Sequence, residues 1–398
     1  MKKLMSLGGN YFQMTLVKAA KRLGYYVIDV DYLPDNPAHK YADEYHNIST
    51  LDREKVLELA KKLKIDGIVS YASDVSAPTA AYVAEKLDLP TNPLESVEIM
   101  THKDRFRTFL NENKFSSNKS AKIFSVSDLK HFYKECNNTI MLKPLHSSGS
   151  KGVSKLDSLD NLADAYEEAT KYARGEHLWA EEFVQRAGYQ VAGDAFLVDG
   201  KIRFFGLANE HFDLLDNGLT GLVPTGESFP CCISTDMKEK AKTAVENVLQ
   251  RLNMKNGAIN LDFMFDNKGD VFIIELGPRN GGNLITDAIA LSSGVDLAEY
   301  TAKAAVGDDI SDLTEQPMKR YISSYIVHTM KEGIYHDLRI ADNFPGKVLR
   351  QDMFIQKGEV MHPFTNGGYG LGAMLLEFTN QEQMLYCMDH MTDYIYVI

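Results

Sequence analysis

The first ninety residues alternate short apolar runs with amphipathic stretches, and this rhythm constrains the fold more than any other feature of the chain. The apolar runs have the length of strands, and each intervening stretch has the 3.6-residue spacing of a helix with one buried face. Strands that alternate with helices predict a parallel sheet with helices on both faces. The expected strands are 3–7, 26–30 and 67–70, and the expected helices are 13–23, 54–63 and 77–87.

After a boundary at 91–93, the pattern changes. A helix is expected from 93 to 112, and later segments mix single helices with pairs of strands and Gly/Pro turns. A chain of 398 residues is too long for one ordinary core, so two or three domains are expected. The predicted fold class is therefore α/β and α+β, with a parallel α/β domain first and α+β domains after it.

The composition excludes several classes of function. The formal net charge of -12 provides no positive field for a nucleic acid or an acidic membrane, so neither is expected as a partner. The apolar run within the opening ten residues is too short for the core of a signal peptide, and no apolar run of 18 residues follows. The four cysteines have neither a disulfide framework nor CxxC spacing. A cytoplasmic protein is expected.

A loop of glycine and serine at 146–152 directly follows a predicted strand that ends near Lys143. Small residues allow backbone N–H groups to approach phosphate oxygens, and the lysine supplies a positive charge. The segment is neither a Walker A loop nor Gly-x-Gly-x-x-Gly, because its lysine precedes the glycines. It is interpreted as a phosphate-binding loop, and a plain flexible surface loop is the alternative for the segment taken alone.

A predicted hairpin at 260–275 carries Asp262 before its turn and Glu275 after it. The two carboxylates should fall on neighbouring antiparallel strands and could lie close together. Such a pair is costly without a cation between its members, and oxygen ligands of this kind suit Mg²⁺. Ordinary surface acids are the alternative, although the apolar run 271–274 before Glu275 argues against it.

Two further segments complete the set. Arg279 stands in a Gly/Pro-rich turn directly after Glu275, where it could bind transferring phosphate oxygens bidentately. The stretch 179–184 runs from a strand into a connector whose backbone could bond an adenine edge, although for this stretch alone a plain edge strand is the better interpretation.

Taken in order, these segments resemble the ATP-grasp superfamily, and within it the carboxylate–amine ligases related to biotin carboxylase and the carbamoyl-phosphate synthase large subunit. The likeness covers nearly the whole chain. It implies a pre-ATP-grasp domain at 1–92, with Ser73-Asp74 at a strand end, and a small ATP-grasp subdomain with linker helix, phosphate loop and hinge at 93–190. A large subdomain with the metal-binding hairpin follows at 191–310, and 311–398 is an α+β segment that completes the ATP-grasp domain.

The resemblance also implies roles for single residues. Arg279 and Lys143 become the catalytic residues, and Asp262 and Glu275 become ligands of Mg²⁺ (or Mn²⁺). The implied ATP-binding residues are Lys103, Lys143, His146, Ser147, Ser148, Gly149, Ser150, Gly152, Glu181, Glu182, Phe183, Val184, Gln190 and Met264.

Two positions depart from the family pattern. Gly277 stands where the family has an asparagine that adds a metal ligand, and water or Asn280 could substitute for it. Gln190 stands near the position of the ribose-binding acid and carries no charge.

The function implied by the resemblance is a ligase that uses ATP to activate a small carboxylate as an acyl phosphate and then joins it to an amine. The alternatives are an enzyme that phosphorylates bicarbonate, as a carboxylase or a carbamoyl-phosphate-type enzyme, and an ATP-binding protein with weak or lost catalysis. A homodimer is compatible with the resemblance. Candidates for the acceptor pocket are Glu210, His211 and the 218–226 loop, with a structural role as the preferred interpretation of His211.

Overall fold

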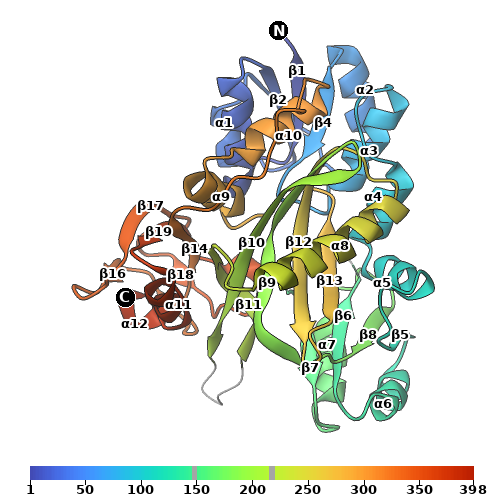
Figure 1. Ribbon diagram of the computed structural model, residues 1–398, viewed down its shortest axis with the longest axis vertical. Helices are drawn as coiled ribbons and strands as arrows, with labels where there is room; N and C mark the ends of the chain where they lie inside the picture. Colours follow the sequence, from blue (N-terminus) through green and yellow to red (C-terminus); the bar gives the residue numbers. More distant parts are fainter. Residues whose placement is uncertain (146–149, 215–219) are drawn as a thin grey trace.

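The computed structural model describes residues 1–145, 150–214 and 220–398, and three larger β-sheets organise these residues (Figure 1). A parallel sheet with its helices forms one end of the molecule. A long antiparallel sheet runs through the middle, and a small antiparallel sheet lies beside it. The predicted fold class, α/β followed by α+β, is confirmed.

The N-terminal sheet has four parallel strands in the order β3-β2-β1-β4. Helix α10 comes from much later in the chain, yet it buries Ala298 and Ala302 in the same core as Leu4 and Val17 (Figure 1). The elements are β1 (Lys3–Leu7), α1 (Met14–Arg22), β2 (Tyr26–Asp31), β3 (Glu44–Asn47), α2 (Arg53–Leu63), β4 (Gly67–Ser70), α3 (Ala77–Lys86) and α10 (Leu297–Ala305), with short 3₁₀ turns at Tyr11–Gln13 and Pro37–Lys40.

The linker differs from the single helix expected at 93–112. Two helices occupy this stretch, α4 (Leu94–Thr101) and α5 (Lys103–Glu112). The chain breaks at His102, whose φ of -112° and ψ of 113° are extended. Lys103 consequently becomes the first residue of a helix instead of an interior one.

The small sheet has four antiparallel strands in the order β5-β8-β6-β7, covered by two helices whose apolar faces share one core with it. Sequence patterns predicted β6 and β8 but not the edge strand β5 or helix α6. The elements are β5 (Ser120–Ile123), α6 (Val126–Glu135), β6 (Ile140–Pro144), β7 (Ser154–Leu156), α7 (Leu162–Thr170) and β8 (Leu178–Glu182).

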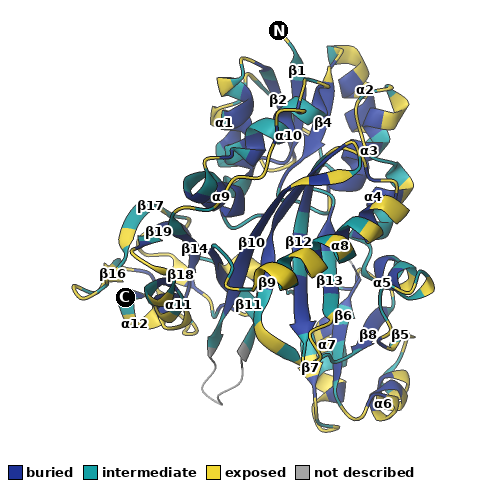
Figure 2. Ribbon diagram, in the orientation of Figure 1, coloured by how far each residue is buried: buried dark blue, intermediate teal, exposed yellow. Residues whose placement is uncertain are grey.

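The large sheet has eight antiparallel strands in the order β13-β12-β9-β10-β11-β14-β19-β17. Helix α8 covers one face, and α9 packs into a second core on the other (Figures 1 and 2). The prediction of an acceptor loop at 218–226 is wrong from Thr220 onward, because strand β11 begins there. The elements are β9 (Arg186–Val198), β10 (Lys201–Leu214), β11 (Thr220–Phe229), α8 (Thr235–Arg251), β12 (Gly257–Asp266), β13 (Val271–Gly277), α9 (Ile285–Ser293), β14 (Tyr321–Val327), β17 (Lys347–Met353) and β19 (Gly372–Phe378).

The C-terminal segment adds two short ribbons and two helices at the far edge of the large sheet (Figure 1). The remaining elements are β15 (Gly333–Ile334), β16 (Leu338–Ile340), β18 (Val360–Met361), a 3₁₀ turn at Gly367–Tyr369, α11 (Gln381–Asp389), α12 (Met391–Tyr394) and β20 (Ile395–Val397).

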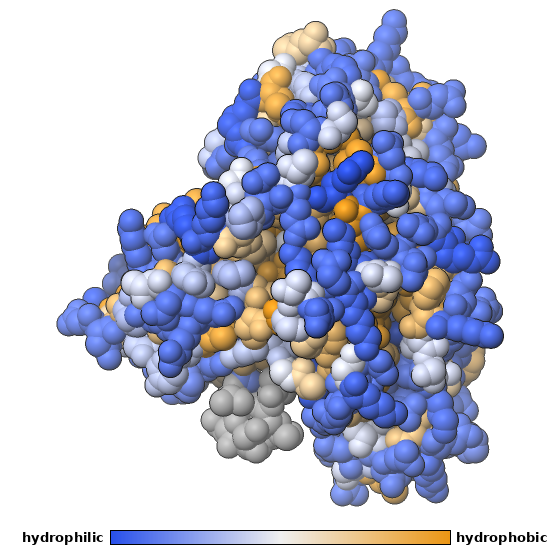
Figure 3. Space-filling model, in the orientation of Figure 1, coloured by the Kyte–Doolittle hydropathy of each residue, from blue (hydrophilic) through white to orange (hydrophobic). Residues whose placement is uncertain are grey.

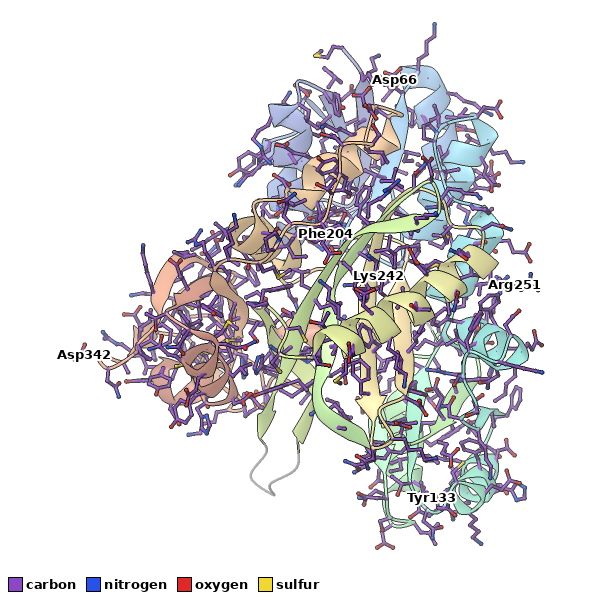
Figure 4. The ribbon with its side chains drawn as sticks, in the orientation of Figure 1. Asp66, Tyr133, Phe204, Lys242, Arg251 and Asp342 are labelled. Carbon is purple, nitrogen blue, oxygen red and sulfur yellow. The ribbon has the colours of Figure 1, made fainter. Side chains whose placement is uncertain are left out.

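Burial follows this layering. Phe204 in the large sheet is 0% exposed and Tyr133 beside the small sheet 4%, whereas Arg251 at the end of α8 is exposed (Figure 4). The face shown in Figure 3 is mainly hydrophilic, with small apolar areas between the charged side chains. Among the described residues, no helix combines the length and the apolar character needed to cross a bilayer.

Candidate nucleotide and metal site

The hairpin of β12 and β13 presents two carboxylates directly opposite each other. Asp262 and Glu275 are cross-strand partners, so the pairing predicted from the sequence is confirmed. A β-bulge makes this possible, since Phe263 pairs with Ile273 and the register then shifts by one residue. In a regular ladder continued from the Phe263–Ile273 pair, Asp262 would face Ile274 instead of Glu275.

The electrostatics of this pair suit a divalent cation. Burial and then the negative charge of Glu275 raise the pKa of Asp262 above its ordinary value, because two adjacent carboxylates resist ionising together. Gln190 Nε2 donates to Asp262 Oδ1 at 2.7 Å, and Lys103 Nζ donates to Glu275 Oε2 at 2.9 Å. Carboxylate oxygens arranged in this way fit the preferences of Mg²⁺, so these two side chains could hold such an ion.

The structure gives a reason for the glycine at position 277, and it excludes Asn280 as a substitute metal ligand. A Cβ at Gly277 would lie 3.0 Å from Asp74 Oδ1 and 3.2 Å from Arg279 Cζ, so a larger side chain would press on that ion pair. Asn280 is 0% exposed, with its amide bonded to Asp194 and Thr301. Asn280 therefore does not face the carboxylate pair.

Lys143 on β6 is held by a buried carboxylate on the neighbouring strand. Its Nζ donates to Glu181 Oε2 at 3.0 Å, and Trp179 Nε1 and Arg107 Nε donate to Glu181 Oε1 at 3.1 and 3.2 Å. Burial alone would raise the pKa of Glu181, but the charges of Arg107 and Lys143 lower it to about 2. The Glu181 side chain thus fixes a lysine, a contact that its implied ATP-binding role did not suggest.

Arg107 connects this cluster to the metal-site hairpin. Its side chain is almost fully buried, and besides Glu181 it donates to the carbonyl oxygens of Ile273 and Ile274 at 3.0 and 3.3 Å. These carbonyls belong to the bulge that sets Asp262 opposite Glu275. The sequence signal for Arg107 was its place four residues after Lys103, on the same face of α5.

Arg279 forms a two-point ion pair with the N-terminal domain. Its Nη2 and Nε lie 2.5 and 2.8 Å from the two carboxylate oxygens of Asp74, at the carboxyl end of β4. Burial would raise the pKa of Asp74, but the charge of Arg279 offsets this and the pKa lies below its ordinary value. The two residues are 205 positions apart in the chain, and together they lie beside the carboxylate pair.

The phosphate-loop prediction falls partly outside the described residues, because His146, Ser147, Ser148 and Gly149 are not among them. Ser150 donates to the Leu222 carbonyl oxygen on β11 at 2.7 Å. Gly152 has a φ of +70°, and a Cβ there would lie 2.8 Å from Tyr172. The described end of the loop is therefore held between the small and the large sheets.

The predicted hinge follows β8. The N–H groups of Glu182 and Phe183 donate to the carbonyl oxygens of Lys119 and Thr139. Within the part of the chain that the structure describes, the Val184 N–H has no hydrogen-bond partner. Met264, two residues beyond Asp262 on β12, is 8% exposed.

A polar row continues from Asp262 across the large sheet. Gln190, Glu210, Glu227 and Ser324 are successive cross-strand partners on β9, β10, β11 and β14. Gln190 Nε2 donates to Glu210 Oε2 at 2.6 Å, and Ser324 Oγ donates to Glu227 Oε2 at 2.5 Å. Glu227 carried no sequence signal, because nothing before the fold showed which strand would lie beside it.

His211, the other acceptor candidate, is 1% exposed. Its ring nitrogens lie 2.7 Å from Asp389 Oδ1 and 2.8 Å from Ser228 Oγ, and it joins β10 to α11. This geometry supports the structural interpretation of His211.

The Glu227→Gln variant is expected to be more stable than the wild type at pH 8 and similar to it near pH 5. Burial raises the pKa of Glu227 to about 7, whereas an unfolded glutamate titrates near about 4.3. Between these values the folded state binds more protons than the unfolded state, so wild-type stability falls as the pH rises. The difference should be on the order of 3 kcal/mol, measured by denaturant unfolding at both pH values.

The matched control is Glu239→Gln on the exposed side of α8, which should follow the wild type at both pH values. Equal stability of Glu227→Gln and wild type at pH 8 would show that the fold does not raise the pKa of Glu227.

No family model matches the chain. The formate-dependent phosphoribosylglycinamide formyltransferase of Prochlorococcus marinus (strain AS9601) is 28% identical over 348 residues, which is 85% of each protein. That of strain MIT 9515 is 29% identical over 187 residues, and there the chain spans about half of the relative, 48%. The carbamoyl phosphate synthase large chain of Thermoanaerobacter pseudethanolicus is 22% identical over 65% of this chain and 24% of its own length.

Solved structures match over the whole chain. The L-amino acid ligase of Bacillus licheniformis superposes with a TM-score of 0.81 and 17% identity, covering 100% of this chain and 98% of that one. The biotin carboxylase domain of the Hydrogenobacter thermophilus 2-oxoglutarate carboxylase, solved with MgADP and bicarbonate, gives 0.75 and 16%, covering 100% and 90%. At these identities the solved structures establish the fold alone. The sequence relatives include a carbamoyl phosphate synthase large chain, an enzyme that the motifs also resemble. In fold and in sequence, the chain resembles the ATP-grasp superfamily.

Proposed function

We propose that this chain is an ATP-dependent carbon–nitrogen ligase that activates a small carboxylate as an acyl phosphate and joins it to an amine. The observation that carries this proposal is the opposed pair Asp262 and Glu275, set face to face by a bulge with Lys103 on Glu275. With the cations of Lys143 and Arg279 nearby, such a pair suits a reaction that brings several anions together.

The nucleotide would lie between the small and the large sheets. The free Val184 N–H suits the adenine edge, with Glu182 and Phe183 beside it and Met264 beneath the ring. Gln190 would hydrogen-bond the ribose hydroxyls. Lys103 and Lys143 would bind the phosphates, and Glu181 would position the Lys143 side chain. The loop residues His146 to Gly149, with Ser150 and Gly152, would cover the phosphates and exclude water.

The reaction proceeds in two displacements. An oxygen of the substrate carboxylate attacks the γ-phosphorus, the bond to the β,γ-bridging oxygen breaks, and ADP leaves with the electron pair. The amine nitrogen then attacks the acyl carbon, loses a proton, and phosphate departs. Bound Mg²⁺ would neutralise charge on the phosphate oxygens, and Arg279 would bind the transferring phosphoryl group through its planar fork.

A substrate screen tests the proposal. The purified chain with MgATP is offered carboxylates and amines singly and in pairs, and released ADP and phosphate are measured. We expect ADP and phosphate in equal amounts only when a carboxylate and an amine are both present. ADP formation with bicarbonate alone would contradict the ligase and favour the bicarbonate-phosphorylating alternative. Nucleotide binding without turnover across the panel would contradict it in favour of a catalytically weak protein.

The Lys143→Ala variant should bind MgADP about 10- to 100-fold more weakly, because a hydrogen bond to a charged group contributes roughly 1.5–3 kcal/mol. Isothermal titration calorimetry measures this directly. The control is Lys122→Ala on β5 of the same sheet, whose side chain is 54% exposed and which should bind as the wild type does. Unchanged affinity in Lys143→Ala would remove Lys143 from the site.

A further inference from the structure

A second cavity opens beside the carboxylate pair, on the side of the N-terminal domain. Its volume is about 220 Å³, and Glu275 and Lys103 are among the residues that line it. Leu145, the last described residue before the phosphate loop, also lines it. Ligand pockets usually measure roughly 300–1,000 Å³, so this cavity is small for a ligand pocket and suits a small metabolite.

Positive charge gathers around the cavity. Arg53 on α2, Lys103 on α5 and Arg174 after α7 all line it. Arg53 pairs with Glu98 at 3.0 Å. Arg174 is exposed, and its guanidinium has no ion-pair or hydrogen-bond partner within residues 1–145, 150–214 and 220–398.

Three helix N-termini reinforce this charge. Arg53 and Lys103 are the first residues of α2 and α5, and Pro78 and Thr79 lie in the first turn of α3. Neither α3 nor α5 has a side-chain cap. Helix N-termini favour anions, and these three helices lie in succession along one side of the molecule (Figure 1).

The acidic residues of the lining do not cancel this charge. Asp74 is fully engaged by Arg279, and Glu275 is the carboxylate proposed to hold a cation. Leu51, Val75, Pro78 and Leu145 supply apolar lining. The cavity thus combines cationic side chains with a short apolar surface.

We propose that this cavity binds the acid substrate, and that the substrate is a small dianion with a second carboxylate or a phosphate. The reacting carboxylate lies beside Glu275 and Lys103, which are hydrogen-bonded to each other, and Arg174 with Arg53 binds the second anionic group. This inference rests on the proposed ligase function, since it names the substrate class of that reaction.

Direct binding tests the inference without relying on turnover. The probes are succinate, phosphonoacetate and propionate. Besides one carboxylate they carry a second carboxylate, a phosphonate and no second anion, respectively, and calorimetry gives their dissociation constants. Succinate or phosphonoacetate should bind at least tenfold more tightly than propionate, and the tighter of the two identifies the second anionic group. Equal affinities for all three probes would overturn the proposal.

Variants assign this preference to Arg174. Arg174→Gln should remove most of the tenfold preference and Arg174→Lys should retain part of it. The control Arg339→Gln, at an arginine on β16 with a 56% exposed side chain, should keep the wild-type preference. A full preference in Arg174→Gln would overturn the role of Arg174.

MgADP binding by each variant checks that the protein is folded and separates the two proposals. Failure of the ligase proposal appears as absent MgADP binding or absent ADP release in the wild type. Failure of the dianion proposal appears as equal dissociation constants of the wild type for the three probes, while the wild type still binds MgADP.

Discussion

Replacement of Glu275 by glutamine is expected to abolish Mg²⁺-dependent ATP turnover while the fold remains intact. The variant keeps the size of the side chain and an oxygen that can accept from Lys103, but it removes one negative charge from the pair with Asp262. A catalytic metal contributes several kcal/mol to transition-state stabilisation, and each 1.4 kcal/mol is a factor of about 10, so turnover should fall by at least about 1,000-fold.

The measurement is ADP release against Mg²⁺ concentration, with circular dichroism to confirm the fold. Glu332→Gln, at an exposed glutamate near β15, is the matched control and should retain activity. Wild-type turnover in Glu275→Gln would remove the metal assignment from this hairpin, whatever the identity of the substrates.

Replacement of Arg107 by methionine should both destabilise the protein and disturb the metal hairpin. The substitution leaves Glu181 buried with fewer cationic partners and leaves the carbonyls of Ile273 and Ile274 without their donor. Breaking a buried ion pair by removal of one partner costs about 3–5 kcal/mol. We expect a loss of that size in denaturant unfolding, together with a higher Mg²⁺ requirement because the bulge loses its support.

Arg105→Met, two residues earlier, provides the comparison. Arg105 has a 39% exposed side chain and contacts Glu98, so its loss should cost less than about 1 kcal/mol. An Arg107→Met/Glu181→Gln double variant should be less destabilised than the sum of the single changes, because it removes the excess buried charge. Additive losses would show that Arg107 acts through packing alone.

The parts that the sequence predicted well depend on neighbours along the chain. The first strands and helices of the N-terminal domain are periodic over short windows, and β4 matches its predicted bounds of 67–70. The sequence also predicted that Asp262 and Glu275 lie on neighbouring strands, because both positions can be counted from the same short turn. Even there, the bulge at Ile274 decided the final register.

Other parts depend on residues that the fold alone brings together. Arg279 was foreseen as a phosphate-binding residue, yet its partner Asp74 lies 205 positions away. The break at His102 divides a stretch that reads as one helix and places Lys103 at a helix start. Local propensity does not register such changes, because they follow from contacts with distant elements.

By itself, the sequence determined the fold class, the order of the motifs and the residue types that gather at the site, because these follow from periodicity and from turn chemistry. Only the tertiary structure decided how the carboxylate pair is held and what surrounds it. It joined Glu181 to Lys143 and Arg107, fixed the bulge that aligns Asp262 with Glu275, and opened the basic cavity at Arg174. The physical reason is that ion pairs and cavities form between side chains far apart in the chain, and packing, not local sequence, sets their distances.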